Sequence, residues 1–261
     1  MLLAVIRTPQ PIAALSADAM KSVAAAAGLA AADVRMRLSG VLPRVLLSER
    51  EADNLDGAAA ALGRLGFATV ICDPAAAPTD DDRIIGRRVA VDGEVLQIWD
   101  GADTCHELPR PAIALVQRGL RTSTETTTTT TTQRKFDAGR ALLSGGLMLT
   151  RKATQTTTQT TETRELFLLI QRRDGAPDVI LYERRLDYRF LGAEMQPASR
   201  ANFDRLLARL RAFCPRTPFD ERAGQPGFLR ALPSTSAEPT DLGLYLIALA
   251  HAQAAAATFS G

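Results

Sequence analysis

Three groups of side chains in the sequence have residue types that could carry chemistry, and the first is Cys105, His106 and Glu107. A thiol beside an imidazole is the composition of an activated nucleophile with its general base. The run lies in a segment that we predict to be a strand, where successive side chains point to opposite faces. We therefore expect the thiol and the imidazole to point apart, and we predict no catalytic residue here.

The second and third groups are an acidic cluster and a glycine pair. Asp80, Asp81 and Asp82 could attract a cation, but no glutamate follows at the spacing of a calcium loop. Gly145 and Gly146 lack the strand-to-helix context of a phosphate loop. The cysteines are odd in number, far apart and without CxxC spacing: Cys72, Cys105 and Cys214. The sequence thus predicts no metal, no cofactor and no enzymatic activity.

The composition is that of a globular protein without strong bulk charge. The chain has 261 residues, of which 46% are hydrophobic and 23% charged, with a formal net charge of +2. This balance gives no electrostatic reason to expect nucleic acid as a partner. Charge is unevenly spread, because residues 117–173 carry ten Lys or Arg against four Asp or Glu. That excess favours an acidic partner for this region.

The two ends of the sequence bear on its location. The first residues, MLLAVIR, lack the charged leader and long apolar region of a signal peptide. The apolar stretch near the other end, LGLYLIALAHAQAAAA, is interrupted by His251 and Gln253 and is too short to predict a transmembrane helix. We expect a cytoplasmic protein, with peripheral association at a membrane as the alternative.

Two threonine-rich runs dominate the middle of the sequence, between positions 121 and 165. They mirror each other about a point between Leu143 and Ser144, so that Glu125 corresponds to Glu162. Threonine is β-branched and favours extended backbone, and facing threonines can pair across strands. Each run is about 16 residues, so a paired ribbon could extend roughly 50 Å. A disordered polar tract is the alternative, since such sequence buries little apolar area.

The residues between the runs predict an apolar tip with a basic collar. The tip comprises Phe136, Leu142, Leu143, Leu147, Met148 and Leu149. The collar comprises Arg134, Lys135, Arg151 and Lys152. This composition could insert shallowly into an anionic membrane surface or form a contact between copies of the chain. A tip that folds back on its own domain is the third alternative.

Residues 1–74 predict a compact α/β unit. LLAVIR is a strand candidate, and Ser16 can cap a helix that Gly28 ends. A second helical piece precedes the extended segment VLPRVLLS, and Ser48 with Glu51 has the spacing of a capping box for a third helix. The strand FATVICD then closes the unit.

A family resemblance covers this first quarter of the chain. The residues that carry it are Gly28, Leu29, Pro43, Val45, Glu51, Ala52, Leu62, Leu65, Gly66 and Val70. In these positions the segment resembles the C-terminal domain of the bacterial ribosomal stalk protein, whose fold is shared with the adaptor of the Clp protease. The lysine-rich helical face of the stalk domain is reduced here to Lys21, Arg35 and Arg37. The resemblance implies a domain that captures a peptide or protein partner.

Residues 75–82 are predicted to be a linker, and residues 83–214 are predicted to form a β-rich domain. Asp92-Gly93 lies between alternating segments and predicts a hairpin. LFLLIQRR and DVILYERR predict a second hairpin, LDYRFLG a further short strand, and residues after Pro197 an amphipathic helix. DGEVLQIWDG followed by HELPRPAIALVQRG resembles a bacterial PH or GRAM-like domain, which implies several strands and a C-terminal helix. The threonine-rich arm (121–165) is then an insertion in that domain.

The complete prediction is an α+β fold: a small stalk-like α/β domain, a β-rich PH-like domain bearing the arm, and a tail (215–261) with a terminal helix. The leading functional hypothesis is a non-enzymatic scaffold that forms homo-oligomers through the arm. The alternatives are a protein that binds or enters a membrane through the tip, and a monomeric protein-binding adaptor with a disordered threonine-rich loop.

Overall fold

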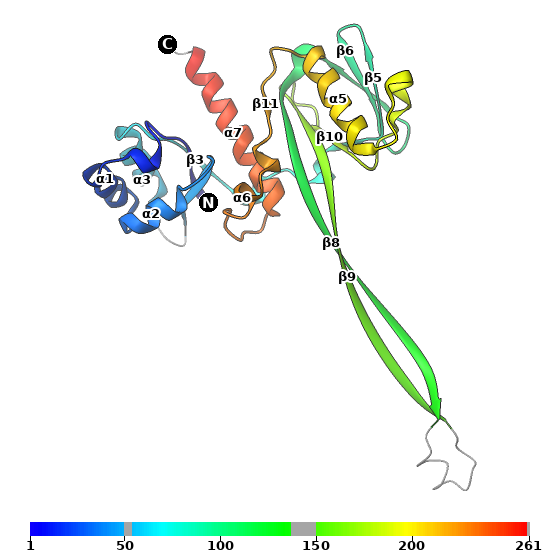
Figure 1. Cartoon of the computed structure of the whole chain (residues 1–261). Coiled ribbons are helices and arrows are strands. Elements are labelled where there is room, and N and C mark those ends of the chain that lie inside the picture. The colour runs from blue at the N-terminus through cyan, green and yellow to red at the C-terminus, as the bar shows by residue number, and fades with distance from the viewer. Residues whose placement is uncertain (50–53, 137–149, 260–261) are drawn as a thin grey trace. The chain divides into compact units, whose positions relative to one another are not determined.

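The computed structural model describes residues 1–49, 54–136 and 150–259, and its fold is α+β, as the sequence predicts. The chain divides into two compact units (Figure 1). Unit 1 consists of Met1–Arg121 and Leu166–Gly261, and unit 2 of Thr122–Glu165. Unit 1 contains the helices and most of the strands described below, whereas unit 2 contains the outer parts of two long strands.

The first part of unit 1 is an antiparallel sheet covered by helices. Its strands are ordered β2-β1-β3, with β1 at Leu2–Arg7, β2 at Arg44–Ser48 and β3 at Ala68–Cys72. The helices are α1 (Ala17–Ala27), α2 (Ala31–Arg37) and α3 (Leu55–Arg64). Leu3 and Val5 of β1 pack with these helices, while Leu2 and Ala4 belong to a separate core. The alternation of β1 therefore places an apolar core on each side of the sheet.

The helix ends show which local signals the sequence carries. The Ser16 side chain accepts a hydrogen bond from the Ala19 amide at 3.1 Å, and Gly28 ends α1 with a φ of 64°, as predicted. The predicted start of α3 at Ser48 is wrong, because Ser48 is the last residue of β2. Asn54 instead accepts a hydrogen bond from the Gly57 amide at 2.7 Å and caps the helix.

A five-stranded mixed sheet forms the centre of unit 1. Its order is β11-β8-β9-β10-β4. The strands are β4 (Ile84–Gly86), β8 (Ile113–Phe136), β9 (Thr150–Arg172), β10 (Val179–Tyr182) and β11 (Phe219–Asp220). Leu168 and Ile170 of β9 pack into one core, and Phe167 and Leu169 into another. This burial on both faces explains the continuous apolar run LFLLI.

One face of this sheet is covered by a second sheet and a helix. The second sheet is antiparallel and ordered β5-β6-β7, with bounds Arg88–Asp92, Val95–Trp99 and Cys105–Pro109. Gly93 turns the β5–β6 hairpin with a φ of 57°, as predicted. The helix is α5 (Ser199–Phe213), whose predicted apolar stripe is buried at Phe203, Leu206, Leu207, Leu210 and Phe213.

The predicted strand at LDYRFLG is wrong, because Tyr188–Glu194 forms the 3-10 segment η5. The Asp187 carboxylate accepts a hydrogen bond from the Arg189 amide at 3.0 Å, which favours a turn over a strand. The other 3-10 turns are η1 (Ile12–Ala14), η2 (Pro74–Ala76), η3 (Asp80–Asp82), η4 (Arg110–Ala112) and η6 (Arg222–Gly224).

The last helix, α7 (Pro239–Phe259), is apolar on two sides because it joins two cores. Leu242 and Leu246 pack with Leu2 and Ala4 of β1 and with Cys72. Leu244 and Ile247 pack with the central sheet and with Phe228 of the short helix α6 (Pro226–Leu229). The terminal helix predicted from the sequence thus docks on its own chain.

Gly119 of β8 lies close to the ring of Phe167, so a larger side chain at this position should destabilise the protein. A Cβ atom at this position would lie 2.1 Å from Cζ of Phe167, a ring that is fully buried. The Gly119→Ala variant should therefore lower the free energy of unfolding by about 2 kcal/mol or more, as measured by urea denaturation.

The matched control is Gly63→Ala on an exposed face of α3, where an added Cβ meets no atom within 4 Å. This variant should be neutral or slightly stabilising, because alanine favours helix over glycine. Equal effects of the two substitutions would contradict the packing assigned to Gly119.

Candidate functional site: the paired strands β8 and β9 and their anchor

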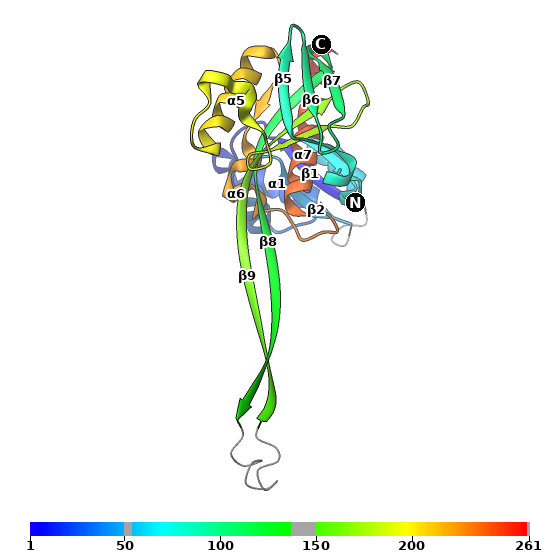
Figure 2. The same cartoon turned by 90° about the vertical axis from the view of Figure 1, so that its right-hand side faces the viewer.

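The most unusual feature of the molecule is the length of two neighbouring strands. β8 has 24 residues and β9 has 23, and they are hydrogen-bonded neighbours that lie side by side in both views (Figure 1 and Figure 2). Their other neighbours are short. β11 pairs with β8 at Val116 and Gln117, and β10 pairs with β9 over residues 167–170. In the described parts of unit 2, β8 and β9 are therefore each other's strand partners.

The limits of these strands follow the mirror relation in the sequence. Thr122 and Glu165, which bound unit 2, are equidistant from the point between Leu143 and Ser144. The end of β8 at Phe136 and the start of β9 at Thr150 agree with the same centre to within one residue. The threonine runs therefore form strands of matched length.

The predicted tip and collar are only partly within the described residues. Phe136 is the last residue of β8, and the other tip residues lie outside the described part of the chain: Leu142, Leu143, Leu147, Met148 and Leu149. In the collar, Arg134 and Lys135 belong to β8, whereas Arg151 and Lys152 belong to β9. A role for the tip or the collar remains a prediction from the sequence.

A partly buried group of charges surrounds Arg121, the last residue of β8 in unit 1. Its Nη1 donates to Asp80 Oδ2 at 2.6 Å, and its Nη2 donates to Asp241 Oδ1 at 2.8 Å. Nη1 also donates to the hydroxyl of Tyr182, which in turn donates to Asp80. These hydrogen bonds join three parts of the chain: the segment before β4, the end of β8 within unit 1, and the start of α7.

Arg83 closes the group into a ring of alternating charges. Its Nη1 donates to Asp80 Oδ1 at 3.1 Å and to Asp241 Oδ1 at 2.7 Å. The Arg83 side chain is 1% exposed and that of Asp241 is 7% exposed, so neither charge is solvated. Two arginines thus share two aspartates, and Glu238 Oε2 lies 3.7 Å from Nη2 of Arg121. We call Asp80, Arg83, Arg121 and Asp241 the anchor ring.

The protonation of the anchor ring follows from its charges. Burial alone would lower the pKa of Arg121, but the nearby carboxylates, Asp241 foremost, raise it above its usual value. Burial raises the pKa of Tyr182, and its hydrogen bond to Asp80 raises it further. The arginine therefore stays charged and the phenol stays protonated, which is the state that these hydrogen bonds require.

A second group joins the buried Asp220 to the partly exposed Arg222 and His251. His251 Nε2 lies 2.8 Å from Asp220 Oδ2, and Arg222 Nε donates to the same oxygen at 2.9 Å. Burial tends to raise the pKa of Asp220, but the hydrogen bonds from His251 and Arg222 outweigh it and hold that pKa well below the usual range. Arg222 Nη1 also donates to the Leu42 carbonyl at 2.6 Å, so this group holds β11 to α7 and to the N-terminal segment.

The side chains considered above as candidates for chemistry do not come together in one site among the described residues. His106 Nε2 lies 2.9 Å from Asp100 Oδ2, and Cys105 is exposed at the start of β7. Asp80 is in the anchor ring, whereas Asp82 accepts hydrogen bonds from Thr79. Burial raises the pKa of the Cys72 thiol to about 11.

The described part of the chain contains neither a cluster of metal-binding side chains nor a helix that could cross a membrane. Within 1–49, 54–136 and 150–259, no three His, Cys, Asp or Glu side chains are grouped as metal ligands. In the same part of the chain, no helix combines the length and apolarity needed to cross a membrane.

Loss of one carboxylate from the anchor ring should lower the stability of the protein strongly. Asp241→Asn removes the buried carboxylate that Arg83 and Arg121 share, leaving Asp80 and the more exposed Glu238, and should lower the free energy of unfolding by about 3 to 5 kcal/mol. The matched control is Asp103→Asn, which breaks an exposed pair with Arg88 and should cost under about 1 kcal/mol. Urea denaturation of both variants measures the difference, and similar costs would argue against the ring.

The depressed pKa of Asp220 predicts a pH dependence of stability. The folded state favours the ionised carboxylate, so its contribution is fully present above the unfolded pKa of about 4 and is lost as the pH falls below it. The stability difference between the wild type and Asp220→Asn should shrink as the pH is lowered from about 5 towards 2. Glu221→Gln, whose carboxylate pairs at the surface with Arg211, should show a small difference throughout. A pH-independent difference for Asp220→Asn would refute the assignment.

Comparison with known proteins identifies no relative of this chain. No family model, no curated protein and no solved structure matches the chain. The resemblances to the ribosomal stalk domain and to PH-like domains therefore rest on the sequence patterns alone. The candidate functional site is defined by the geometry of β8, β9 and the anchor ring.

Proposed function

We propose that this protein is a non-enzymatic assembly component whose copies associate by strand pairing along β8 and β9. One observation carries the proposal. Over residues 122–136 and 150–165, the two long strands have each other as strand partners, while β10 and β11 pair only with their inner parts. Each long strand therefore has one edge whose backbone groups can pair with another chain.

The sequence of these strands favours pairing with strands of another copy over an isolated two-stranded ribbon. Edge strands in proteins are commonly protected by charged residues or proline. Residues 126–132 are all threonine, and residues 153–161 contain only alanine, threonine and glutamine, so both stretches lack charge and proline. A two-stranded ribbon is also marginally stable by itself in water. Association with further strands would supply the hydrogen bonds that the ribbon lacks.

The anchor ring holds β8 within unit 1, at the residue before unit 2 begins. Arg121 is the last residue of unit 1 in β8, and its two aspartate partners belong to η3 and α7. Pulling on β8 must therefore break buried ion pairs as well as strand hydrogen bonds. An element that links copies of a protein needs this kind of resistance.

Two other hypotheses from the sequence remain as alternatives with distinct outcomes. A membrane contact would use the apolar tip, most of which lies outside the described residues. An adaptor role would use the N-terminal sheet and helices as a site for a protein partner. Neither requires pairing between β8 and β9 of different copies.

The test is the native mass of the full chain, measured by light scattering over a range of concentrations. We expect a discrete oligomer for the wild type. Replacing Thr127, Thr129 and Thr131 with lysine should convert it to a monomer at low salt, because a row of charges on an edge strand opposes pairing with another chain. Raising the salt to about 1 M should restore part of the assembly by screening these charges.

The matched control replaces the same three threonines with glutamine, a residue of similar length that β9 already contains at Gln155 and Gln159. This neutral variant should remain oligomeric. A wild type that is monomeric at every concentration would sink the proposal. A monomer that assembles only on anionic vesicles would move the membrane hypothesis to first place.

A further inference from the structure

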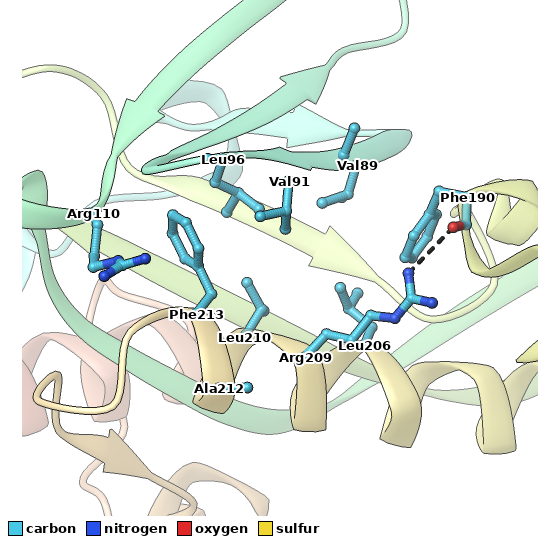
Figure 3. A pocket seen from close by; sticks show the side chains of 12 residues that line it. Val89, Val91, Leu96, Arg110, Phe190, Leu206, Arg209, Leu210, Ala212 and Phe213 are labelled. Carbon is cyan, nitrogen blue, oxygen red and sulfur yellow. Dashed lines mark hydrogen bonds between the residues drawn. The ribbon is translucent and has the colours of Figure 1, made fainter.

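Two clefts of unit 1 differ in how much of their lining a ligand could reach. The cleft between the β5–β6 hairpin and α5 has a volume of about 500 Å³, and Figure 3 shows its apolar lining. Leu96, Leu206 and Leu210 of that lining are at most 1% exposed and already pack in the core. The cleft between the N-terminal sheet and the last turns of α7 has a volume of about 640 Å³. The side chains of Arg222 and His251 in its lining are 24% and 31% exposed, so this second cleft has accessible polar groups.

The strand beside the second cleft, β3, is an open edge of the N-terminal sheet. Among the described residues, β1 is its one strand neighbour. The Thr69 carbonyl accepts a hydrogen bond from Gln253 Nε2 of α7 at 3.4 Å, so it points away from β1. Because backbone groups alternate along a strand, those of Ile71 also point outward, whereas those of Val70 face Ala4 of β1. The N–H and C=O groups of two residues are therefore directed towards the position of an added strand.

The side chains along this edge suit an added strand. β3 has the sequence ATVIC, without the charged residues or proline that commonly protect edge strands. Thr69, Val70 and Ile71 are β-branched and only partly buried. Val70 packs on the same core as the partly exposed Tyr245 and Leu249 of α7, and Ile71 packs on the core under the N-terminal helices. An extended chain at this edge would thus meet apolar side chains on both faces.

The two ends of β3 differ in charge. Four lining residues of the cleft at the Ala68 end carry a charge or an N–H donor, and none is acidic: Arg7, Arg222, His251 and Gln253. Asp220 engages Arg222 and His251, whereas Arg7 is exposed and takes part in no ion pair among the described residues. At the other end, the exposed Asp73 follows the last residue of β3. A negative group on a bound chain is therefore favoured at the Ala68 end.

We propose that the β3 edge binds the C-terminal segment of a partner protein as an added antiparallel strand, with the terminal carboxylate at Arg7. β3 runs from Ala68 to Cys72, so an antiparallel chain ends beside Ala68 and places its carboxylate at the cleft. A parallel chain would bring its carboxylate to Asp73 instead. Main-chain hydrogen bonds supply the affinity of such strand addition. The site uses none of β8 or β9, so it is independent of the assembly proposed above.

The test is a fluorescence anisotropy titration in which the full-length protein is added to a labelled heptapeptide of alternating threonine and valine. We expect saturable binding of the peptide with a free carboxylate, and binding of its C-terminal amide at least threefold weaker. Arg7→Gln should weaken binding of the acid by about threefold to fivefold and leave binding of the amide unchanged. The matched control is Arg64→Gln, at an exposed arginine of α3 outside the cleft lining, which should change neither affinity.

A second pair of variants tests the backbone of the edge. Thr69→Pro removes the outward N–H of Thr69 and should weaken binding of both peptides by at least about tenfold. Proline is tolerated in an edge strand where the N–H faces solvent, so the fold should survive. Thr69→Val keeps the N–H and the β-branched shape, and should bind within about twofold of the wild type. Lysine at positions 127, 129 and 131 should leave peptide binding unchanged, because β8 is not part of this site.

Thermal unfolding followed by circular dichroism identifies any variant that loses structure. The proposal is overturned if the wild type shows no saturable binding, if acid and amide bind equally, or if folded Thr69→Pro binds as the wild type does. Equal effects of Arg7→Gln and Arg64→Gln would also overturn it. Loss of binding in the triple lysine variant, with binding kept in Thr69→Pro, would place the peptide on β8 and refute the site at β3.

Discussion

The buried carboxylate of Asp241 holds together parts of the chain that are distant in sequence. It accepts hydrogen bonds from Arg83 at 2.7 Å and from Arg121 at 2.8 Å, and it lies in the first turn of α7. A buried charge is tolerated only when opposite charges and hydrogen bonds compensate it. Because the two arginines belong to the segments that begin β4 and carry β8, this requirement fixes where α7 starts relative to the central sheet. The two apolar sides of α7 then contact both cores.

The central sheet shows how burial and strand chemistry change along one continuous strand. β9 has buried residues on both faces at Phe167 to Ile170, where the sheet is covered on each side. Beyond Leu166, towards its start at Thr150, its sequence becomes threonine-rich and its second strand neighbour ends. Apolar burial stabilises the inner part of the strand, whereas the outer part depends on backbone pairing. This contrast is the physical reason for placing the proposed assembly contact on the outer strands.

Much of the local structure was predictable because its signals are short-range. Ser16 and Gly28 bound α1, Asp92-Gly93 turns a hairpin, and the apolar spacing of α5 predicts its buried face. Such signals depend on residues within a few positions of each other. Two predictions from local signals were wrong. Ser48 was predicted to cap α3, but Asn54 caps it, and LDYRFLG was predicted to be a strand, but a 3-10 segment forms there.

The groups that define the sites were decided by tertiary structure alone. Asp80 reads in the sequence as part of a solvated acidic linker, yet the fold brings it to Arg121 and places Asp241 beside the same arginine. The pairing of Asp220 with His251 likewise links residues far apart in the chain. The sequence by itself determined the class of fold, the threonine-rich runs and their mirror relation, because these depend on composition and local spacing. Only folding decided which charges are buried together, because that depends on long-range packing that no local pattern records.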